Sequence, residues 1–212
     1  MGMSGRPLLI TDCDEVLLHM VGPFKTWLES DHAIDFDLEG ENFEGALVRR
    51  HDASVVESAE IWPLLDAFFT NQMHSQTLVP HADRALATIA EVADIVVLTN
   101  ITEQFHAGRV DQLAALDIRH RVQCNQGGKG EPIRRLVEEF QPSVTVFVDD
   151  TPFHHTSVAK YAPDVWRLHM IAEPRVAARR AAAADAHARI DDWTDALPWI
   201  LGRFGEGAKA AA

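Results

Sequence analysis

The sequence predicts an α/β fold with a Rossmann-like, mostly parallel sheet flanked by helices, because buried-strand patterns alternate with helical patterns. Continuous apolar runs are typical of strands buried on both faces, and they occur at residues 8–13, 94–99 and 144–149, with weaker runs at 120–124 and 165–170. Apolar residues at helical spacing lie between these runs, at 81–92, 102–116 and 131–140. Strands joined by helices in this order form right-handed βαβ units.

One region interrupts this alternation. Between residues 19 and 79 there is no buried-strand run, and two helical patterns, at 23–32 and 55–69, flank an acidic, irregular segment. The region has 11 acidic and 3 basic residues, a net charge of −8 out of −13 for the whole chain. We predict a small, mainly helical cap at 19–79 inserted into an α/β core. The core comprises 1–18 and 80–204, followed by a disordered tail at 205–212.

The length and composition agree with this division. The chain has 212 residues, more than the roughly 150 residues of one typical domain and fewer than two such domains would need. Apolar residues make up 47% of it and charged residues 24%, as in ordinary globular proteins. Near its end, an alanine-rich helix is expected from residue 173 to about 190. The apolar residues from Trp193 to Phe204 are expected to pack on the core, with a homodimer contact as the alternative.

Charge and cysteine content restrict the partners and the location. A net charge of −13 argues against a nucleic-acid partner, which normally requires a basic face. No run approaches the roughly 20 apolar residues of a membrane span, and no signal peptide is evident at the start. Two cysteines, Cys13 and Cys124, are too few for a disulfide framework. We therefore expect a cytoplasmic protein with no membrane or nucleic-acid partner.

Acidic residues follow two of the predicted strands at the point where each one ends. Asp12 and Asp14 follow the first strand, and Asp149 and Asp150 follow the fourth. Ligands of open α/β sheets bind at the carboxyl ends of the strands, so these four carboxylates are expected to converge. Two unit charges 4 Å apart repel by about 4 kcal/mol at an effective dielectric constant of 20. The sequence therefore predicts a site for a divalent cation, with Mg²⁺ favoured by the oxygen ligands.

The same edge should carry residues that bind a phosphate. Thr99 and Asn100 end the second strand, and Lys129 lies in a glycine-rich loop before a helix. Backbone N–H groups at the helix start after Thr99 would bind an anion. Side chains alternate along a strand, so Asp12 and Asp14 should point to one side, as a nucleophile and a general acid/base. This set of residues suits phosphoryl transfer through an aspartyl-phosphate.

The order Asp-x-Asp, strand-Thr, Lys, strand-Asp-Asp resembles the haloacid dehalogenase (HAD) superfamily of phosphohydrolases, over about residues 8–18 and 80–170. The resemblance implies that Asp12 is the nucleophile and that Asp14 is the acid/base. It also implies that the Asp14 backbone carbonyl binds Mg²⁺. The family's first type of cap is inserted after the first motif, where residues 19–79 lie.

The resemblance assigns the remaining positions as well. Thr99 and the Asn100 amide would hold the phosphoryl group, and Lys129 would steady the charges of the phosphate and the nucleophile. Asp149 and Asp150 would complete the metal site. The sequence departs from the family pattern at Glu15, where glycine is common, and at His154, where asparagine is common.

Other interpretations of single residues remain open. Thr99 alone would equally suit a helix N-cap. His154 and His155 are more often structural, and Cys13 is expected to be a core residue facing away from Asp12 and Asp14. A response-regulator receiver domain is excluded by the order of the motifs.

The sequence as a whole predicts a Mg²⁺-dependent phosphohydrolase acting on small phosphomonoesters. The alternatives are a phosphotransferase or mutase on the same fold, and a non-catalytic module that binds phosphate for regulation.

Overall fold

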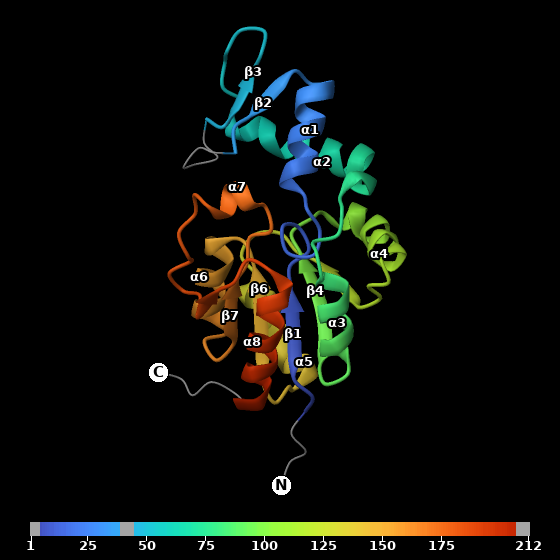
Figure 1. Ribbon diagram of the computed structural model, residues 1–212, viewed down its shortest axis with the longest axis vertical. Helices are drawn as coiled ribbons and strands as arrows, with labels where there is room; N and C mark the ends of the chain where they lie inside the picture. The colour runs from blue at the N-terminus through green and yellow to red at the C-terminus, as the bar shows by residue number, and fades with distance from the viewer. Residues whose placement is uncertain (1–4, 39–44, 207–212) are drawn as a thin grey trace.

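The computed structural model describes residues 5–38 and 45–206 and has a parallel six-stranded sheet at its centre (Figure 1). The strand order is β5-β4-β1-β6-β7-β8, and every pairing in it is parallel. The strands are β1 Leu8–Thr11, β4 Asp94–Thr99, β5 Arg121–Cys124, β6 Thr145–Asp149, β7 Trp166–His169 and β8 Ala188–Arg189. The predicted fold class is confirmed.

Helices cover both faces of the sheet. On one face α3 (Ala82–Ala90) and α8 (Trp193–Glu206) pack against each other. On the other face α5 (Gly130–Phe140) lies against α6 (Pro152–Tyr161). The helix α4 (His106–Ala115) follows a short 3₁₀ turn, η2 (Glu103–Phe105), and leads back to β5.

The central strand β1 is buried on both sides, which fixes where it ends. Leu9 belongs to the apolar cluster under α3 and α8, whereas Leu8 and Ile10 belong to the cluster under α5 and α6. All three side chains are fully buried. Hydrogen bonds to β4 and β6 hold the strand on either side, so the loop after Thr11 starts from a rigid position.

The region predicted as a cap lies above the carboxyl ends of the strands in Figure 1. Its elements are α1 (Val21–Asp31), β2 (Ile34–Phe36), β3 (Leu47–Arg49), α2 (Ser58–Gln72) and the 3₁₀ turn η1 (Met73–Ser75). The antiparallel pair β2–β3 was not expected, because three-residue strands leave little pattern in a sequence. Ile34 and Phe36 face the cap interior with exposed Asp35 between them.

Two chain crossings join the core to the cap, and they lie side by side. The His19 N–H donates to the Thr77 carbonyl, and the Val79 N–H donates to the Leu17 carbonyl, each at 2.8 Å. Beyond them, an aromatic cluster around Phe24 and Phe68, with ring centroids 5.4 Å apart, fills the cap. Core residues such as Phe105 join this cluster, so the cap rests on apolar contacts.

The last part of the chain differs from the prediction. The helix expected at 173–190 is wrong: α7 covers only Pro174–Ala177, and the chain then runs irregularly to β8. Arg189 accounts for this, because its guanidinium donates to the Ala177 carbonyl at 2.6 Å and to the Arg180 carbonyl. These contacts outweigh the helix propensity of the alanines in this segment.

The end of the chain also differs from the expected disordered tail at 205–212. Gly205 and Glu206 belong to α8, and 207–212 lie outside the described residues. Trp193 and Ile200 of α8 are fully buried in the core, as predicted. No helix within the described residues is long and apolar enough to cross a membrane.

Candidate active site

Asp12 and Asp149 share one buried lysine at the carboxyl edge of the sheet. Lys129 Nζ lies 2.8 Å from Asp12 Oδ1 and 2.6 Å from Asp149 Oδ2, and its side chain is fully buried. Burial raises the pKa of Asp12 to about 6, although the nearby ammonium lowers it. Burial would lower the pKa of Lys129, but the two carboxylates raise it above its usual range. Lys129 is therefore a fixed cation beside Asp12.

Three carboxylates lie close enough to hold one metal ion. One oxygen each from Asp12, Asp149 and Asp150 lies within 4.8 Å of the other two. Burial and the charges of Asp149 and Asp12 raise the pKa of Asp150 well above its usual range. One lysine leaves this group with excess negative charge, and carboxylate oxygens are hard ligands that suit Mg²⁺. The donor set fits the predicted cation.

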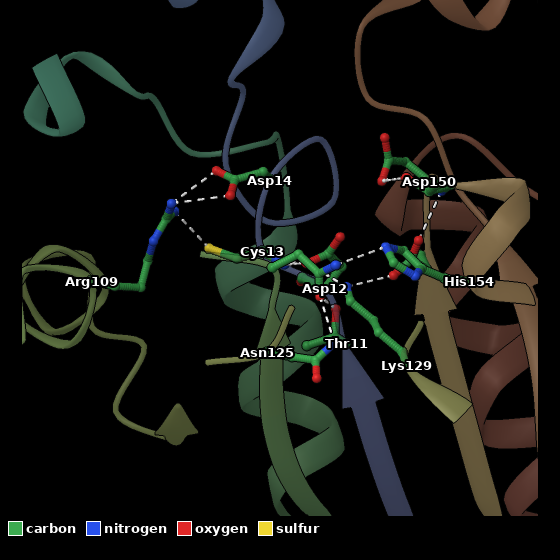
Figure 2. A network of polar contacts seen from close by, with 12 residues as sticks. Thr11, Asp12, Cys13, Asp14, Arg109, Asn125, Lys129, Asp150 and His154 are labelled. Carbon is green, nitrogen blue, oxygen red and sulfur yellow. Dashed lines mark hydrogen bonds and ion pairs between the residues drawn. The ribbon is translucent and has the colours of Figure 1, made fainter. Parts of the chain in front are cut away.

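The fourth predicted carboxylate points elsewhere. Asp14 accepts hydrogen bonds from Arg109 Nη2 at 3.0 Å and 3.1 Å and from Gln76 Nε2 at 2.6 Å. Figure 2 shows its carboxylate turned toward Arg109 and away from Lys129. The expectation that all four carboxylates converge is thus wrong for Asp14. The alternation argument fails because β1 ends at Thr11, before the Asp-x-Asp motif.

Cys13 shares the partner of Asp14. Arg109 Nη1 donates to Cys13 Sγ at 3.0 Å, so Cys13 and Asp14 face one guanidinium instead of opposite sides (Figure 2). Burial raises the pKa of the Cys13 thiol to about 12. Cys13 is a buried thiol, as predicted, but its side-chain direction was predicted wrongly.

Arg109 was not identified from the sequence. Its side chain is fully buried on α4, and its guanidinium lies 5.5 Å from the centroid of the Phe69 ring of the cap. A signal was available, because Phe105, Arg109 and Leu113 recur every four residues. A basic residue on the apolar stripe of a helix needs an acidic partner. Here that partner is Asp14.

The residues expected to bind phosphate lie beside this group. Thr99 is fully buried at the end of β4, and its Oγ1 has no hydrogen-bond partner. Asn100 Nδ2 donates to the Gly127 carbonyl at 2.9 Å and lies 3.3 Å from His154 Nε2. Asn125 Nδ2 donates to Asn100 Oδ1 at 2.9 Å. Thr99 is thus placed at the carboxyl edge with a buried hydroxyl that no side chain or backbone group satisfies.

His154 is held neutral next to this site. Burial, with the charge of Lys129, lowers its pKa to about 4. A neutral imidazole adds no charge to the group of Asp12, Asp149 and Asp150. His154 and Asn125 therefore support Asn100 from two sides.

The glycine-rich loop brings Lys129 into place. A Cβ at Gly128 would lie 2.5 Å from Ser157 Oγ, and one at Gly130 would lie 2.2 Å from the Ser157 carbonyl oxygen. Only glycine permits this close approach of α5 to α6. The approach places Lys129, which lies between the two glycines, against β6.

Glu15, which replaces the glycine common in the resembling family, has a structural role. Its φ is 59°, in the left-handed region that glycine prefers. Its Oε1 accepts hydrogen bonds from the Met20 and Val21 N–H groups, each at 2.7 Å. Burial raises the pKa of Glu15. Its carboxylate therefore satisfies two N–H groups at the N-terminus of α1. These hydrogen bonds connect the Asp-x-Asp loop to the first helix of residues 19–79.

A cavity of about 410 Å³ opens next to Asn100, between cap and core. Trp62, Leu65 and Phe69 of α2 form its cap side, and Asn100 and Gly127 form part of its core side. The exposed fraction of Trp62 is 71%, so its ring is free at the rim. The apolar side chains on its cap side allow the cavity to accept an apolar group.

Solved structures share this architecture. A haloacid dehalogenase-like family hydrolase from Streptococcus pneumoniae aligns with a TM-score of 0.62 at 11% identity, covering 94% of this chain and 100% of that chain. A candidate HAD-hydrolase from Bacillus subtilis, described as bound to magnesium, has a TM-score of 0.62 at 12% identity, covering 93% and 99%. A candidate β-phosphoglucomutase from Thermotoga maritima has a TM-score of 0.56 at 14% identity, covering 92% and 99%.

These likenesses concern the fold. No model of a known protein family and no sequence of a curated protein matches the chain. Fold and site together define a doubly wound α/β protein with carboxylates at the ends of the adjacent strands β1 and β6. The fold is that of the haloacid dehalogenase-like hydrolases, as the order of motifs implied.

Proposed function

We propose that this protein is a Mg²⁺-dependent phosphohydrolase of small phosphomonoesters. The observation that carries the proposal is the position of Asp12. Its carboxylate lies against Lys129 and within 4.8 Å of Asp149 and Asp150 oxygens, at the end of the central strand. A reactive carboxylate surrounded by further anions suits chemistry on a phosphate only if cations offset the charge.

Asp12, Asp149 and Asp150 would hold the metal ion. Bound there, Mg²⁺ would neutralise charge on the phosphate and allow an anionic nucleophile to approach it. Lys129 supplies a second positive charge on the side of Asp12 and Asp149. Thr99 Oγ1, which is buried without a partner, would donate to a phosphoryl oxygen.

The reaction proceeds in two displacements at phosphorus. In the first, an Asp12 oxygen forms a bond to phosphorus, the ester P–O bond breaks, and the leaving oxygen takes the electron pair. In the second, water attacks phosphorus, the bond to Asp12 breaks, and the carboxylate is regenerated with its electron pair. The proton lost by the water goes to bulk solvent, which balances the proton taken up by the released alcohol.

Phosphate release from a panel of phosphomonoesters tests this proposal. We expect turnover that requires Mg²⁺ and that Asp12→Asn lowers at least about 10⁴-fold, because the amide is not a nucleophile. The fold of this variant is checked by circular dichroism. Unchanged turnover in Asp12→Asn would end the assignment of the nucleophile.

A phosphotransferase or mutase is the second candidate. It is favoured by the cap, which can shield a phosphorylated Asp12 from water, and one fold neighbour is described as a β-phosphoglucomutase. Product analysis separates the two, because transfer yields a new phosphoester where hydrolysis yields inorganic phosphate. Tight binding of phosphate without turnover would favour the non-catalytic module instead.

The charge of the cap supports a small substrate with no second anionic group. Residues 19–79 carry a net charge of −8, and none of the described residues that line the cavity is Lys or Arg. We expect kcat/KM for small monoesters to exceed that for oligonucleotide 5′-phosphates. Equal values would contradict this. The cytoplasmic location and the homodimer stay predictions.

A further inference from the structure

Two buried histidines lie behind the metal-binding end of β6, and the proposed function gives them no role. His155 on α6 and His169 at the end of β7 have no solvent-exposed surface. Their rings contact each other edge to face, with centroids 5.4 Å apart. Polar side chains buried this completely need hydrogen-bond partners, and the partners of both rings lie in the Asp149–Asp150 segment.

Each ring donates a hydrogen bond to a backbone carbonyl of that segment. His155 Nε2 lies 3.0 Å from the Asp149 carbonyl oxygen, and His169 Nε2 lies 2.9 Å from the Asp150 carbonyl oxygen. A carbonyl oxygen can only accept, so Nε2 carries a proton in both rings. His169 Nδ1 accepts a hydrogen bond from the Ala183 N–H at 3.0 Å, so this ring is held from both sides.

These two carbonyls determine the direction of the Asp150 side chain. The Asp149 carbonyl belongs to the peptide plane before Asp150, and the Asp150 carbonyl belongs to the plane after it. Because peptide units are planar, fixing both planes fixes the φ and ψ angles of Asp150 and with them the direction of its Cβ. Asp149 is the last residue of β6, so strand pairing does not fix the second plane. The hydrogen bond from His169 fixes it instead.

Asp150 needs this restraint because the neighbouring carboxylates repel it. One of its oxygens lies within 4.8 Å of oxygens of Asp12 and Asp149. Before a cation binds, this repulsion favours a backbone conformation that turns the Asp150 carboxylate away from the other two. A backbone that is already held in place keeps the third ligand ready for the cation.

We infer that His169, assisted by His155, is a positioning residue that holds the Asp149–Asp150 backbone in the conformation that binds a divalent cation. This inference rests on the Mg²⁺ site of the proposed function. The two histidines differ in weight, because the Asp149 carbonyl also accepts the Met170 N–H at 3.0 Å and keeps that donor without His155. We therefore expect the larger effect from His169.

Two substitutions of His169 separate its contact with Asp150 from its contact with Ala183. Glutamine can place an amide N–H where the ring Nε2 lies, so His169→Gln keeps the donor to the Asp150 carbonyl. Asparagine is shorter and places its oxygen where Nδ1 lies, so His169→Asn keeps the acceptor for the Ala183 N–H and loses the donor to Asp150.

Isothermal titration calorimetry with Mg²⁺ alone, without a phosphoester, gives the Kd of each variant. Residues that orient a metal ligand contribute about 10–100-fold to metal affinity. The Kd for Mg²⁺ should therefore rise by about that factor in His169→Asn, and His169→Gln should recover most of the loss. His155→Leu should raise the Kd by less than His169→Asn does.

His106→Leu is the matched control. His106 on α4 makes the same kind of contact, with Nε2 3.1 Å from the carbonyl oxygen of Val122 on β5, away from the Asp149–Asp150 segment. The control should lose some stability but keep the Kd of the wild type. Thermal unfolding in EDTA measures the stability of every variant, so that a weaker Mg²⁺ site is not confused with a weaker fold.

Equal Kd values in His169→Gln and His169→Asn would show that the ring has only a structural role and would overturn the inference. If His169→Asn does not fold, His155→Leu is compared with His106→Leu, and equal Kd values in these two would overturn it. Failure of the proposed function gives a different result. Mg²⁺ binding without turnover of any phosphoester would overturn the phosphohydrolase and leave this inference standing, whereas a wild type that does not bind Mg²⁺ would overturn both.

Discussion

Lys129 controls the electrostatic balance of the site at the scale of single residues. Its ammonium contacts Asp12 and Asp149, and none of its side chain reaches solvent. Removing one partner of a buried ion pair leaves the other charge uncompensated, which costs about 3–5 kcal/mol. Here two carboxylates would lose the same partner.

Lys129→Met should therefore destabilise the metal-free protein by about 3–5 kcal/mol. The loss should depend on pH. Burial already raises the pKa of Asp12 to about 6, and without the ammonium it rises further. A raised folded-state pKa of a carboxyl destabilises the fold above that pKa, so the deficit of the variant should shrink as the pH falls through 6.

Urea unfolding in EDTA at pH 8 and pH 5 measures this. Lys160→Met on the exposed side of α6 is the matched control, expected within about 0.5 kcal/mol of the wild type. A deficit in Lys129→Met that stayed constant between the two pH values would contradict the account.

The sequence predicted the gathering of residues at strand ends better than the direction of their side chains. Asp12, Asp149, Asp150 and Lys129 meet because parallel strands present their carboxyl ends at one edge. The direction of Asp14 could not be predicted, since it depends on where β1 ends and on a guanidinium from a distant helix. The catalytic roles stay predictions.

At the scale of elements, Glu15 links the loop after β1 to the start of α1. It accepts two N–H groups there while its backbone has a φ of 59°. The carboxylate stabilises α1 through these bonds and through the positive end of the helix dipole. The backbone conformation costs about 1–2 kcal/mol for any residue other than glycine.

Glu15→Ala and Glu15→Gly separate these two effects. Both variants lose the carboxylate that accepts hydrogen bonds from the start of α1, but only glycine relieves the strain of the left-handed backbone. Glu15→Ala should therefore be less stable than Glu15→Gly by about 1 kcal/mol. Midpoints of urea unfolding compare the two. An alanine variant as stable as the glycine variant would show that the backbone is not strained.

The contact between α5 and α6 depends on Gly130. A Cβ there would meet the Ser157 carbonyl oxygen at 2.2 Å, which backbone atoms can relieve only by separating the helices. We expect Gly130→Ala to cost about 2 kcal/mol or more and to displace Lys129. Gly202→Ala in α8 has nothing within 4 Å of its Cβ and should gain about 1 kcal/mol of stability.

Thermal unfolding of both alanine variants checks this prediction. Opposite signs of the two changes in Tm are expected. A Gly130→Ala variant with unchanged Tm would mean that the two helices do not approach so closely.

Long elements were predictable and short ones were not. The helices at 81–92, 102–116 and 131–140 correspond to α3, α4 and α5 because a complete apolar stripe marks each of them. β2 and β3 have three residues each, and β8 has two. Strands this short are defined by their backbone pairing with a neighbouring strand, because they are too short to show a pattern of apolar residues in the sequence. The predicted helix at 173–190 failed because contacts with Arg189 decide that segment.

On the scale of the whole molecule, folding brings three carboxylates from distant parts of the chain, those of Asp12, Asp149 and Asp150, to one edge of the sheet. Asp150 shows the consequence, since burial and the charges of Asp149 and Asp12 hold its pKa well above the usual range. Without a cation, the repulsion between these carboxylates lowers the free energy of unfolding. A bound cation should remove this repulsion and raise the free energy of unfolding.

Mg²⁺ at a concentration 100 times its Kd should therefore stabilise the folded wild type by about 2.7 kcal/mol, and so raise its Tm. Asp150→Asn should be more stable than the wild type in EDTA, because one repelling charge is gone, and should gain less from Mg²⁺. Differential scanning calorimetry with and without Mg²⁺ measures both effects. A metal-free Asp150→Asn that is less stable than the wild type would contradict the proposed repulsion.

The most direct measurement for the central claim is the covalent state of Asp12 during turnover. The enzyme is mixed with Mg²⁺ and phenyl phosphate, quenched in acid, and the peptide containing Asp12 is analysed by mass spectrometry. The account predicts the mass of one phosphoryl group on Asp12 and none in Asp12→Asn. Phosphate release with no phosphorylated Asp12 at any quench time would contradict it.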